Sequence, residues 1–521
     1  MSSHLVVLPI VLPLFSGALM LALGRRGARW VPALSLLSVA AGLVLSIMLL
    51  RQADSGAVLA YLPGNWRAPF GIALALDRLA ALMLLLTSLV ALASLLHALG
   101  GEHRRGRHFH ALFQFQLMGL NGAFLTADLF NLFVFFEVLL AASYGLLLHG
   151  GDSGRRARLQ AALHYVVFNL AGSALFLVAA SLLYGLAGTL NLADLAIKLP
   201  QLGPGSAALV QAAALLLLLV FALKAALLPL YFWLPDTYSA ASAPVAALFA
   251  IMTKVGVYAV LRMTTLVFGA DAGAAAQVAQ PVLPLLALAT LVLAAAGALA
   301  ARRLTTLVGY LVIGSAGTLL LAVGIGTPAS VAAGLFYLVT STLAAAAWFL
   351  LADRIAAARG GSDVLLPATL ARGWAPLGAA FMLAAVAMAG LPPLGGFFGK
   401  AMLLQSAATL PHAGWIVALV LGSSGIVMVA LARAGSRLFW ERGSAAPALA
   451  PTRPVQGAGL ALLLALVLAA AVGAGPLSAY GSATAAQLFE RHGYIDTVLN
   501  EPAVPPAFDV RREMRERGDA K

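Results

Sequence analysis

Runs of about 20 apolar residues recur along the whole chain, separated by short segments rich in arginine, proline and glycine. A helix of about that length crosses the hydrocarbon core of a bilayer. Of the 521 residues, 62% are hydrophobic and 10% are charged, whereas a soluble domain is roughly 45–50% apolar and about 25% charged. The sequence therefore predicts an all-α polytopic membrane protein and excludes a soluble redox enzyme.

Breaks at charges, prolines and glycines divide the chain into fourteen candidate spans. They lie at 4–24, 31–50, 73–98, 111–127, 129–149, 159–185, 207–230, 243–267, 281–300, 304–324, 329–353, 375–408, 414–436 and 456–475. The segment 51–72 is too polar and too rich in proline and glycine to be a span. The first run has its arginines after it rather than before it, which is typical of a retained helix and not of a cleaved signal peptide.

The arginines and lysines between the spans alternate in a way that assigns sidedness. Loops after odd-numbered spans carry 18 arginines, and loops after even-numbered spans carry Arg51, Arg67 and Lys198. Cytoplasmic loops are the ones enriched in basic residues. We therefore expect odd loops on the cytoplasmic side and both termini on the other side, with a mixed-charge extramembrane tail from about residue 476. The net charge of +13 follows from this sidedness and does not indicate nucleic-acid binding.

Two ionisable residues lie deep inside apolar spans. Glu137 is in LFNLFVFFEVLLAASYG and Lys224 is in LLLLLVFALKAALLPLYFWLP. A charge at the bilayer centre costs about 2.5–3.5 kcal/mol or more, so it persists only beside water or a partner. Burial favours the neutral form of both groups, and each responds to the charge of the other. We predict that they carry protons, and the alternative is a static buried ion pair.

Other ionisable residues near or within spans are less decisive. Lys254 and Lys400 lie in the eighth and twelfth spans. At the start of the third span, Asp77 and Arg78 are expected to form a structural pair at a helix end. We expect Arg262 to extend to the membrane interface and Asp128 to cap a helix near the surface. His164 is interpreted either as a relay member or as a hydrogen-bonded interior histidine.

Prolines interrupt two spans that also carry a lysine. Lys224 precedes Pro229, and Lys400 follows Pro392 and Pro393. A proline inside a helix removes a hydrogen bond, and in a membrane such a break persists only where protein or water satisfies the freed backbone. Because paired interruptions indicate inverted repeats, we predict repeats at 111–267 and 281–436. They follow N-terminal helices at 1–110 and precede a last helix and tail at 437–521. A chance pair of kinked helices is the alternative.

Long runs of the sequence resemble the D subunits of Mrp-type (Pha-type) multisubunit monovalent cation/proton antiporters. These runs are FHALFQFQLMGLNGAFLTADLFNLFVFFEVLLAASYGLLLHGG, LHYVVFNLAGSALFL, LLYGLAGTLNLADLA, FALKAALLPLYFWLPDTYSAASAPVAALFAIMTKVGVYAVLR and AMAGLPPLGGFFGK. The broader family includes the antiporter-like membrane subunits of respiratory complex I and of membrane-bound hydrogenases. The resemblance implies fourteen helices, two inverted five-helix repeats with broken helices 7 and 12, and no cofactor or metal.

The resemblance also implies roles. Glu137, Lys224, Lys254 and Lys400 match the family's line of ionisable residues, which would carry protons near the midplane. The match departs in the eleventh span, where the family carries histidine and this chain has Thr340, followed by Ser341 and Thr342. Because hydroxyls hold water but carry no proton charge, the link between Lys254 and Lys400 is expected to depend on water.

The resemblance implies partners and a location. We expect other membrane subunits of the A/B, C, E, F and G types, transport of H⁺ with Na⁺ or K⁺, and residence in the bacterial cytoplasmic membrane. Three other interpretations stay open: a redox-driven proton-pumping subunit of complex I or a hydrogenase, a structural scaffold, and a free-standing transporter of a small organic solute. Cysteine is absent, which excludes disulfides and thiolate sites.

Overall fold

The computed structural model is a bundle of helices that describes residues 3–24, 27, 29–150, 154–367, 375–441 and 454–501. Within this part of the chain, eleven helices are long and apolar enough to cross a membrane, and α1 and α15 are shorter apolar helices. This architecture follows from composition, because a backbone in lipid must satisfy its own hydrogen bonds. The helical membrane fold is confirmed, and the count of fourteen crossings stays a prediction.

The N-terminal part comprises the shorter helix α1, two long helices and a small hairpin. Its elements are η1 (Ser3–Val6), α1 (Leu8–Leu23), α2 (Val31–Ala53), β1 (Leu59–Tyr61), η2 (Pro63–Asn65), β2 (Leu74–Leu76), α3 (Arg78–Leu99) and η3 (Glu102–Arg104). The two strands pair antiparallel, with Leu59 opposite Leu76. The polar segment 51–72 contains the end of α2, the hairpin strand β1 and the turn η2, and no separate span, as its composition predicted.

The next part contains the first interrupted helix. Its elements are α4 (Phe109–Leu125), α5 (Leu129–Leu148), α6 (Arg155–Ala187), α7 (Leu192–Lys198), η4 (Leu199–Gln201), η5 (Pro204–Ser206), α8 (Ala207–Lys224), α9 (Trp233–Ala240), α10 (Ala243–Phe249), α11 (Met252–Arg262), the π-helix η6 (Met263–Val267) and η7 (Gly273–Ala275). The predicted break near Pro229 separates α8 from α9. A further break, between α10 and α11, was not predicted.

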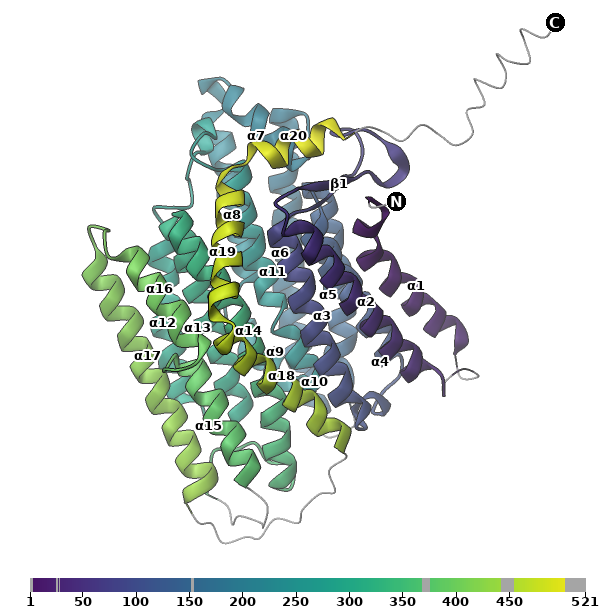
Figure 1. The fold of residues 1–521 in the computed structure, drawn as a ribbon, viewed down its shortest axis with the longest axis vertical. Coiled ribbons are helices and arrows are strands. Elements are labelled where there is room, and N and C mark those ends of the chain that lie inside the picture. Colours follow the sequence, from purple (N-terminus) through teal and green to yellow (C-terminus); the bar gives the residue numbers. More distant parts are fainter. Residues whose placement is uncertain are drawn as a thin grey trace, which may run out of the picture.

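The C-terminal half contains the second interrupted helix. Its elements are α12 (Leu283–Ala300), α13 (Leu304–Ile325), α14 (Pro328–Ala358), α15 (Ala375–Ala389), α16 (Gly395–Ala407), α17 (Ala413–Gly435), the π-helix η8 (Ser436–Trp440), α18 (Pro454–Val472), α19 (Ala474–Phe489) and α20 (His492–Asn500). The break between α15 and α16 contains Pro392 and Pro393, as predicted. In Figure 1, α18 and α19 run across the bundle, and α19 packs on α14.

The helices differ in how completely the protein surrounds them. In the most apolar 18-residue stretch of each helix, every residue is buried for the segment 243–267 and 94% are buried for α14, whereas only 28% are buried for α2 and for the segment 413–440. The interior of the bundle is therefore built around α10, α11 and α14. Helical structure also continues beyond residue 475, where the sequence interpretation placed the end of the last span. The charged residues from Arg511 onward lie outside the described residues.

Candidate functional site

Glu137 and Lys224 lie on neighbouring helices of the first interrupted region. Glu137 projects from α5, is half-buried, and accepts a hydrogen bond from the Ser173 hydroxyl of α6. Lys224 is the last residue of α8 and is buried, with its Nζ 5.0 Å from the centre of the Phe136 ring. Glu137 acts electrostatically on Lys224. Among the described residues, no hydrogen-bond partner of Lys224 Nζ is present.

The backbone turns sharply after Lys224. Ala226 has a φ of 57°, and the backbone N–H of Leu228 donates to Thr290 Oγ1 at 3.0 Å. The indole N–H of Trp233 donates to the carbonyl of Leu223 at 3.1 Å. Gly256 of α11 lies so close to the turn that an added Cβ would be 2.5 Å from the Ala225 nitrogen. The break is therefore held by polar side chains and by contact with the Lys254 helix, as a break inside a membrane requires.

Lys254 follows the unpredicted break between α10 and α11. Its side chain is fully buried, and Nζ donates to Ser315 Oγ of α13 at 2.8 Å and to Thr253 Oγ1 at 3.3 Å. Both partners are hydroxyls, and no carboxylate within the described residues forms an ion pair with it. An amine held only by hydroxyls can be charged or neutral without losing its contacts.

Lys400 lies one turn into α16, beyond the proline break. Its Nζ donates to the backbone carbonyl of Ala389 at 3.0 Å and to Ser424 Oγ at 2.9 Å. The carbonyl belongs to the last residue of α15, where the break leaves it without a helical partner. The interruption of the helix therefore supplies the polar contact that a buried lysine needs.

A small cavity, here called the Lys400 cavity, connects the surroundings of Lys254 and Lys400. Its volume is about 30 Å³, enough for a water molecule. Its polar lining comprises Tyr310, Ser315, Thr318, Tyr337, Lys400, Ser423 and Ser424. Ser315 is also the partner of Lys254. The hydroxyls that link the two lysines thus come from α13, α14 and α17.

Thr340 and Ser341, which were expected to hold water in the link between Lys254 and Lys400, bond to their own helix instead. Their hydroxyls donate to backbone carbonyls of their own helix, and Thr340 packs against Gly395 at the start of α16. Neither residue lines the Lys400 cavity. Tyr337, about one turn earlier on α14, does line it.

Asp77 and Arg78 do not form the expected pair. Asp77 caps α3 by accepting from the Ala80 N–H, and it binds Arg262 through two hydrogen bonds of 2.6 and 2.9 Å. Arg262 is buried beneath the Tyr494 ring of α20. The expectation that Arg262 extends to the interface is therefore wrong, because a buried carboxylate 185 positions away in the chain holds it. Arg78 donates instead to the carbonyls of Asp54 and Ala483.

The two remaining predictions on single residues differ in outcome. Asp128 caps α5 by accepting from the Asn131 N–H at 2.8 Å, so its predicted place at a helix end is confirmed. His164 is exposed on α6 beside the exposed Leu163 and Val167. It is therefore not an interior histidine within this chain, because its helix face turns away from the bundle.

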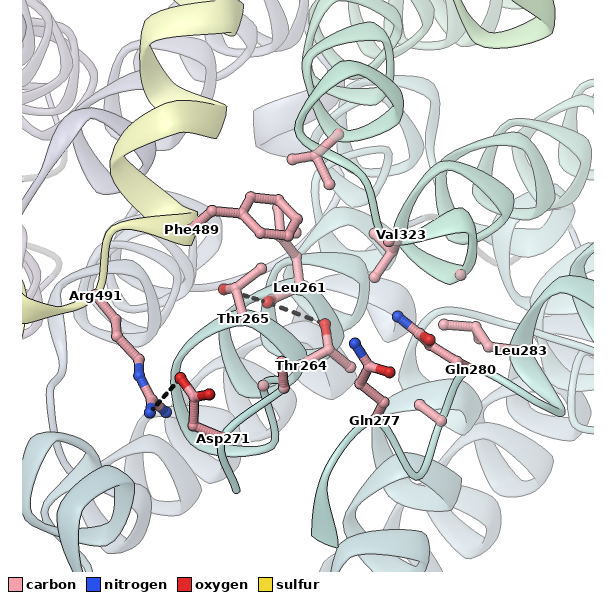
Figure 2. Close-up of a pocket in the computed structure, with 16 residues that line it drawn as sticks. Leu261, Thr264, Thr265, Asp271, Gln277, Gln280, Leu283, Val323, Phe489 and Arg491 are labelled. Atoms are coloured by element: carbon pink, nitrogen blue, oxygen red, sulfur yellow. Dashed lines mark hydrogen bonds and ion pairs between the residues drawn. The ribbon is translucent and has the colours of Figure 1, made fainter. Parts of the chain in front are cut away.

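Two larger cavities lie at opposite ends of the segment 243–267. One, here called the Arg491 cavity, has a volume of about 120 Å³ and is lined by Leu261, Thr264 and Thr265 at the end of that segment. Figure 2 shows Arg491, just after α19, reaching Asp271, and the two side chains are 2.9 Å apart. The other, here called the Glu102 cavity, has a volume of about 190 Å³ and is lined by Ala243 and Ala246 of α10.

The sequence pattern of a family described as "NADH:quinone oxidoreductase/Mrp antiporter, TM" matches residues 126–428. This range contains both interrupted helices, Glu137 and the three lysines. The chain belongs to this family.

Relatives within the antiporter family match along nearly the whole chain. The D subunit of a probable K⁺/H⁺ antiporter of Rhizobium meliloti is 42% identical and aligns with 96% of this chain and 98% of its own length. The D subunit of a Na⁺/H⁺ antiporter of Bacillus subtilis is 36% identical over 96% of this chain and 100% of its own. The resemblance to D subunits is thus confirmed, and these two relatives are named for different cations.

Chains in three solved complexes share the fold. The Mrp complex from Dietzia contains a chain with a TM-score of 0.84 and 27% identity, covering 95% of this chain and 100% of that one. Respiratory complex I from Thermus thermophilus contains one with a TM-score of 0.77 and 29% identity, covering 93% and 99%. A chain of an archaeal membrane-bound sulfane sulfur reductase has a TM-score of 0.86 and 26% identity, covering 95% of this chain and 100% of that one.

Several polar residues of the site were not found from the sequence. Ser315, Thr318, Tyr337 and Ser424 are single hydroxyl residues in apolar spans, which is common in membrane helices and gives no signal by itself. Their significance comes from facing one cavity beside a lysine. A pair of hydroxyls three or four residues apart on one helix, such as Ser315 and Thr318, offers a partial signal.

Proposed function

We propose that the chain is a proton-translocating subunit of a multisubunit monovalent cation/proton antiporter, a secondary transporter and not an enzyme. Family membership and the names of its relatives support this proposal. We place it in the bacterial cytoplasmic membrane with both termini outside, on the alternation of basic loops. Its partners are other membrane subunits, because the similar solved chains come from multisubunit assemblies.

The proton route runs along Glu137, Lys224, Lys254 and Lys400. The observation that carries this route is that all three lysines lie beside helix breaks. Among the described residues, Lys254 and Lys400 are held only by hydroxyls and a carbonyl. Lys224 has the Glu137 carboxylate as its electrostatic partner and forms no direct ion pair with any described residue. A proton gained or lost at one group therefore changes the charge felt by the next.

One half-channel opens to each side of the membrane. The Arg491 cavity lies at the end predicted to be non-cytoplasmic, where α11 continues into the π-helix η6. Arg491 and Phe489 line it from the C-terminal helices. The exchanged cation is Na⁺ or K⁺, the property in which the two named relatives differ.

Cation-dependent collapse of a pH gradient in everted vesicles tests this function. The host lacks its own antiporters and expresses this chain with or without its neighbouring genes. We expect activity only with the neighbours, and its loss in both Glu137→Ala and Lys224→Ala. Unchanged antiport by both variants in an assembled complex contradicts the relay.

A second candidate function keeps the proton chemistry but supplies redox energy. The high structural similarity to the sulfane sulfur reductase and complex I chains favours it. The test is whether the assembled complex, confirmed on a native gel, carries out cation-dependent antiport. If it does not, and if redox subunits co-purify with it, the redox-driven function is supported.

A further inference from the structure

Several buried titratable side chains that are not part of the relay cluster at the end of the bundle opposite to the Arg491 cavity. Glu102 of η3 and His149 at the end of α5 are 6% and 5% exposed. His149 Nε2 lies 3.0 Å from the Glu102 carbonyl, and Arg105 lies 3.0 Å from the Glu102 carboxylate. Both side chains have a polar partner, as buried polar groups require, and both lie beside a cavity.

These two side chains line the Glu102 cavity together with residues of the helix interior. Asp353 of α14, Tyr238 of α9 and Ala246 of α10 form other parts of its wall. The Asp353 carboxylate lies 3.0 Å from Nε2 of the buried His97, which joins α3 to α14 at this level. The volume of about 190 Å³ accommodates several water molecules.

Tyr238 connects the cavity to the break that precedes Lys254. Its buried hydroxyl donates to the carbonyl of Phe249, the last residue of α10, at 2.6 Å. The next carbonyl, of Ala250, accepts from Thr253 Oγ1 at 3.4 Å, and Thr253 Oγ1 accepts from Lys254 Nζ at 3.3 Å. Tyr238 thus holds the first carbonyl at the break and Thr253 the second, so that polar groups lie between the cavity wall and the central lysine.

We propose that Glu102, with His149 beside it, is a proton-loading site at the cytoplasmic mouth of the route to Lys254, and that Tyr238 is the positioning residue between cavity and lysine. The inference rests on the proposed proton-translocating function and adds an entrance to it. A proton from the cytosol binds the Glu102 carboxylate, passes to water in the cavity, and leaves the carboxylate ready for the next one. No bond other than those to the proton is made or broken.

The electrostatic surroundings suit this exchange. Burial raises the pKa of Glu102 against the lowering effect of Arg105, and burial lowers the pKa of His149. The charged and titratable groups that act on these two side chains are His97, His103, Arg105, Arg158 and Asp353, and the buried His110 interacts with His149. The Arg303–Asp363 pair lines the opposite part of the cavity. The raised pKa brings Glu102 closer to the pH of the cytosol, where a proton collector operates, while His149 stays neutral and free to hydrogen-bond.

The test uses the assembled complex in everted vesicles, whose medium bathes the cytoplasmic face. Vesicles loaded with the exchanged cation draw protons from the medium, and the initial rate of lumenal acidification is recorded while medium pH or lumenal pH is varied separately. For Glu102→Gln we expect a loss of about tenfold or more in alkaline medium, which shrinks as the medium is acidified because protons become abundant. Varying the lumenal pH should leave the ratio of the variant's initial rate to the wild-type rate unchanged.

Asp194→Asn is the matched control, because Asp194 is another buried carboxylate in a salt bridge, with Lys198 at 2.9 Å, and does not line the Glu102 cavity. It should behave as wild type. Tyr238→Phe, which removes only one oxygen, should reproduce the medium-side defect, and it decides the matter if Glu102→Gln does not assemble. A wild-type rate for Glu102→Gln and Tyr238→Phe in alkaline medium, or a loss equal at every medium pH, overturns the proton-loading site.

Failure of this inference is separable from failure of the proposed function. If Glu102→Gln has the wild-type rate and Lys254→Ala is inactive, the proton-loading site is refuted and the relay is retained. An active Lys254→Ala variant removes the relay itself.

Discussion

The two proline-interrupted helices place a lysine at opposite sides of their breaks. Lys224 ends α8 before its break, has no hydrogen-bond partner among the described residues, and faces the Phe136 ring and the field of Glu137. Lys400 follows its break and is bonded to a freed carbonyl and a serine. Both lysines therefore lie at a broken helix, but their surroundings differ. The protonation of Lys224 responds to the charge of Glu137, whereas Lys400 is held by hydrogen bonds to local polar groups.

This difference indicates that the two lysines have different roles in the proposed proton route. The charge of Lys224 depends on its neighbour, so it suits the step at which protonation at one site is sensed at another. Lys400 keeps its contacts whether or not a neighbour changes charge, so it suits storage of a proton at the end of the route. Substitutions at the two breaks test this contrast.

The largest expected effect is on antiport after removal of each lysine. Lys224→Ala should lower the initial rate of cation-dependent proton movement by about a hundredfold or more, and Lys400→Ala by about tenfold, because only the first removes the group coupled to Glu137. Rates in everted vesicles, normalised to assembled complex, measure this. Equal losses would show that the two breaks are functionally equivalent.

Arginine replacements sharpen the contrast. Arginine keeps the positive charge but does not release its proton. Lys224→Arg should be as inactive as Lys224→Ala, because the step requires a change of charge. Lys400→Arg should lie between wild type and Lys400→Ala if contacts to Ala389 and Ser424 matter beyond proton release. The same vesicle assay applies, and a fully active Lys224→Arg would mean that its charge is fixed during turnover.

The breaks should also differ from ordinary helix in their tolerance of added volume. A Cβ at Gly396 would lie 2.1 Å from the Ala387 carbonyl oxygen, and one at Gly256 would lie 2.5 Å from the Ala225 nitrogen. Each alanine substitution should destabilise the chain by about 1–3 kcal/mol, since backbone must move. Gly422→Ala on α17 is the control, with no atom within 4 Å. Thermal unfolding of the purified complex measures the difference, and three equal transitions would refute close backbone contact at the breaks.

The smallest effect is expected for single hydroxyls near Lys400. Ser424→Ala removes one of two partners of Lys400, and Ser315→Ala removes the better partner of Lys254. We expect losses of roughly twofold to tenfold in antiport rate, because a water molecule in the Lys400 cavity can replace a hydroxyl. Rates in ordinary and heavy water measure the dependence on proton movement. A loss as large as that of Lys400→Ala would make Ser424 part of the obligatory route.

Much of the architecture could be predicted from the order of the residues alone. Apolar runs and their interruptions placed α8 and α9 and also α15 and α16, because composition and proline act locally. The break between α10 and α11 escaped prediction, since no proline or glycine marks residues 250 and 251 and the carbonyl freed there is bound by Tyr238 from another helix.

Local composition is enough to show which residues are costly in a membrane. Glu137, Lys224, Lys254 and Lys400 stand out because a charge in an apolar span needs water or a partner. The contacts of each of these residues, in contrast, depend on the packing of the helices. Arg262 meets Asp77, and Ser315 meets Lys254, across long stretches of chain. Hydropathy is a property of neighbouring residues in the sequence, whereas a hydrogen bond depends on which helices pack together and which faces they turn toward each other.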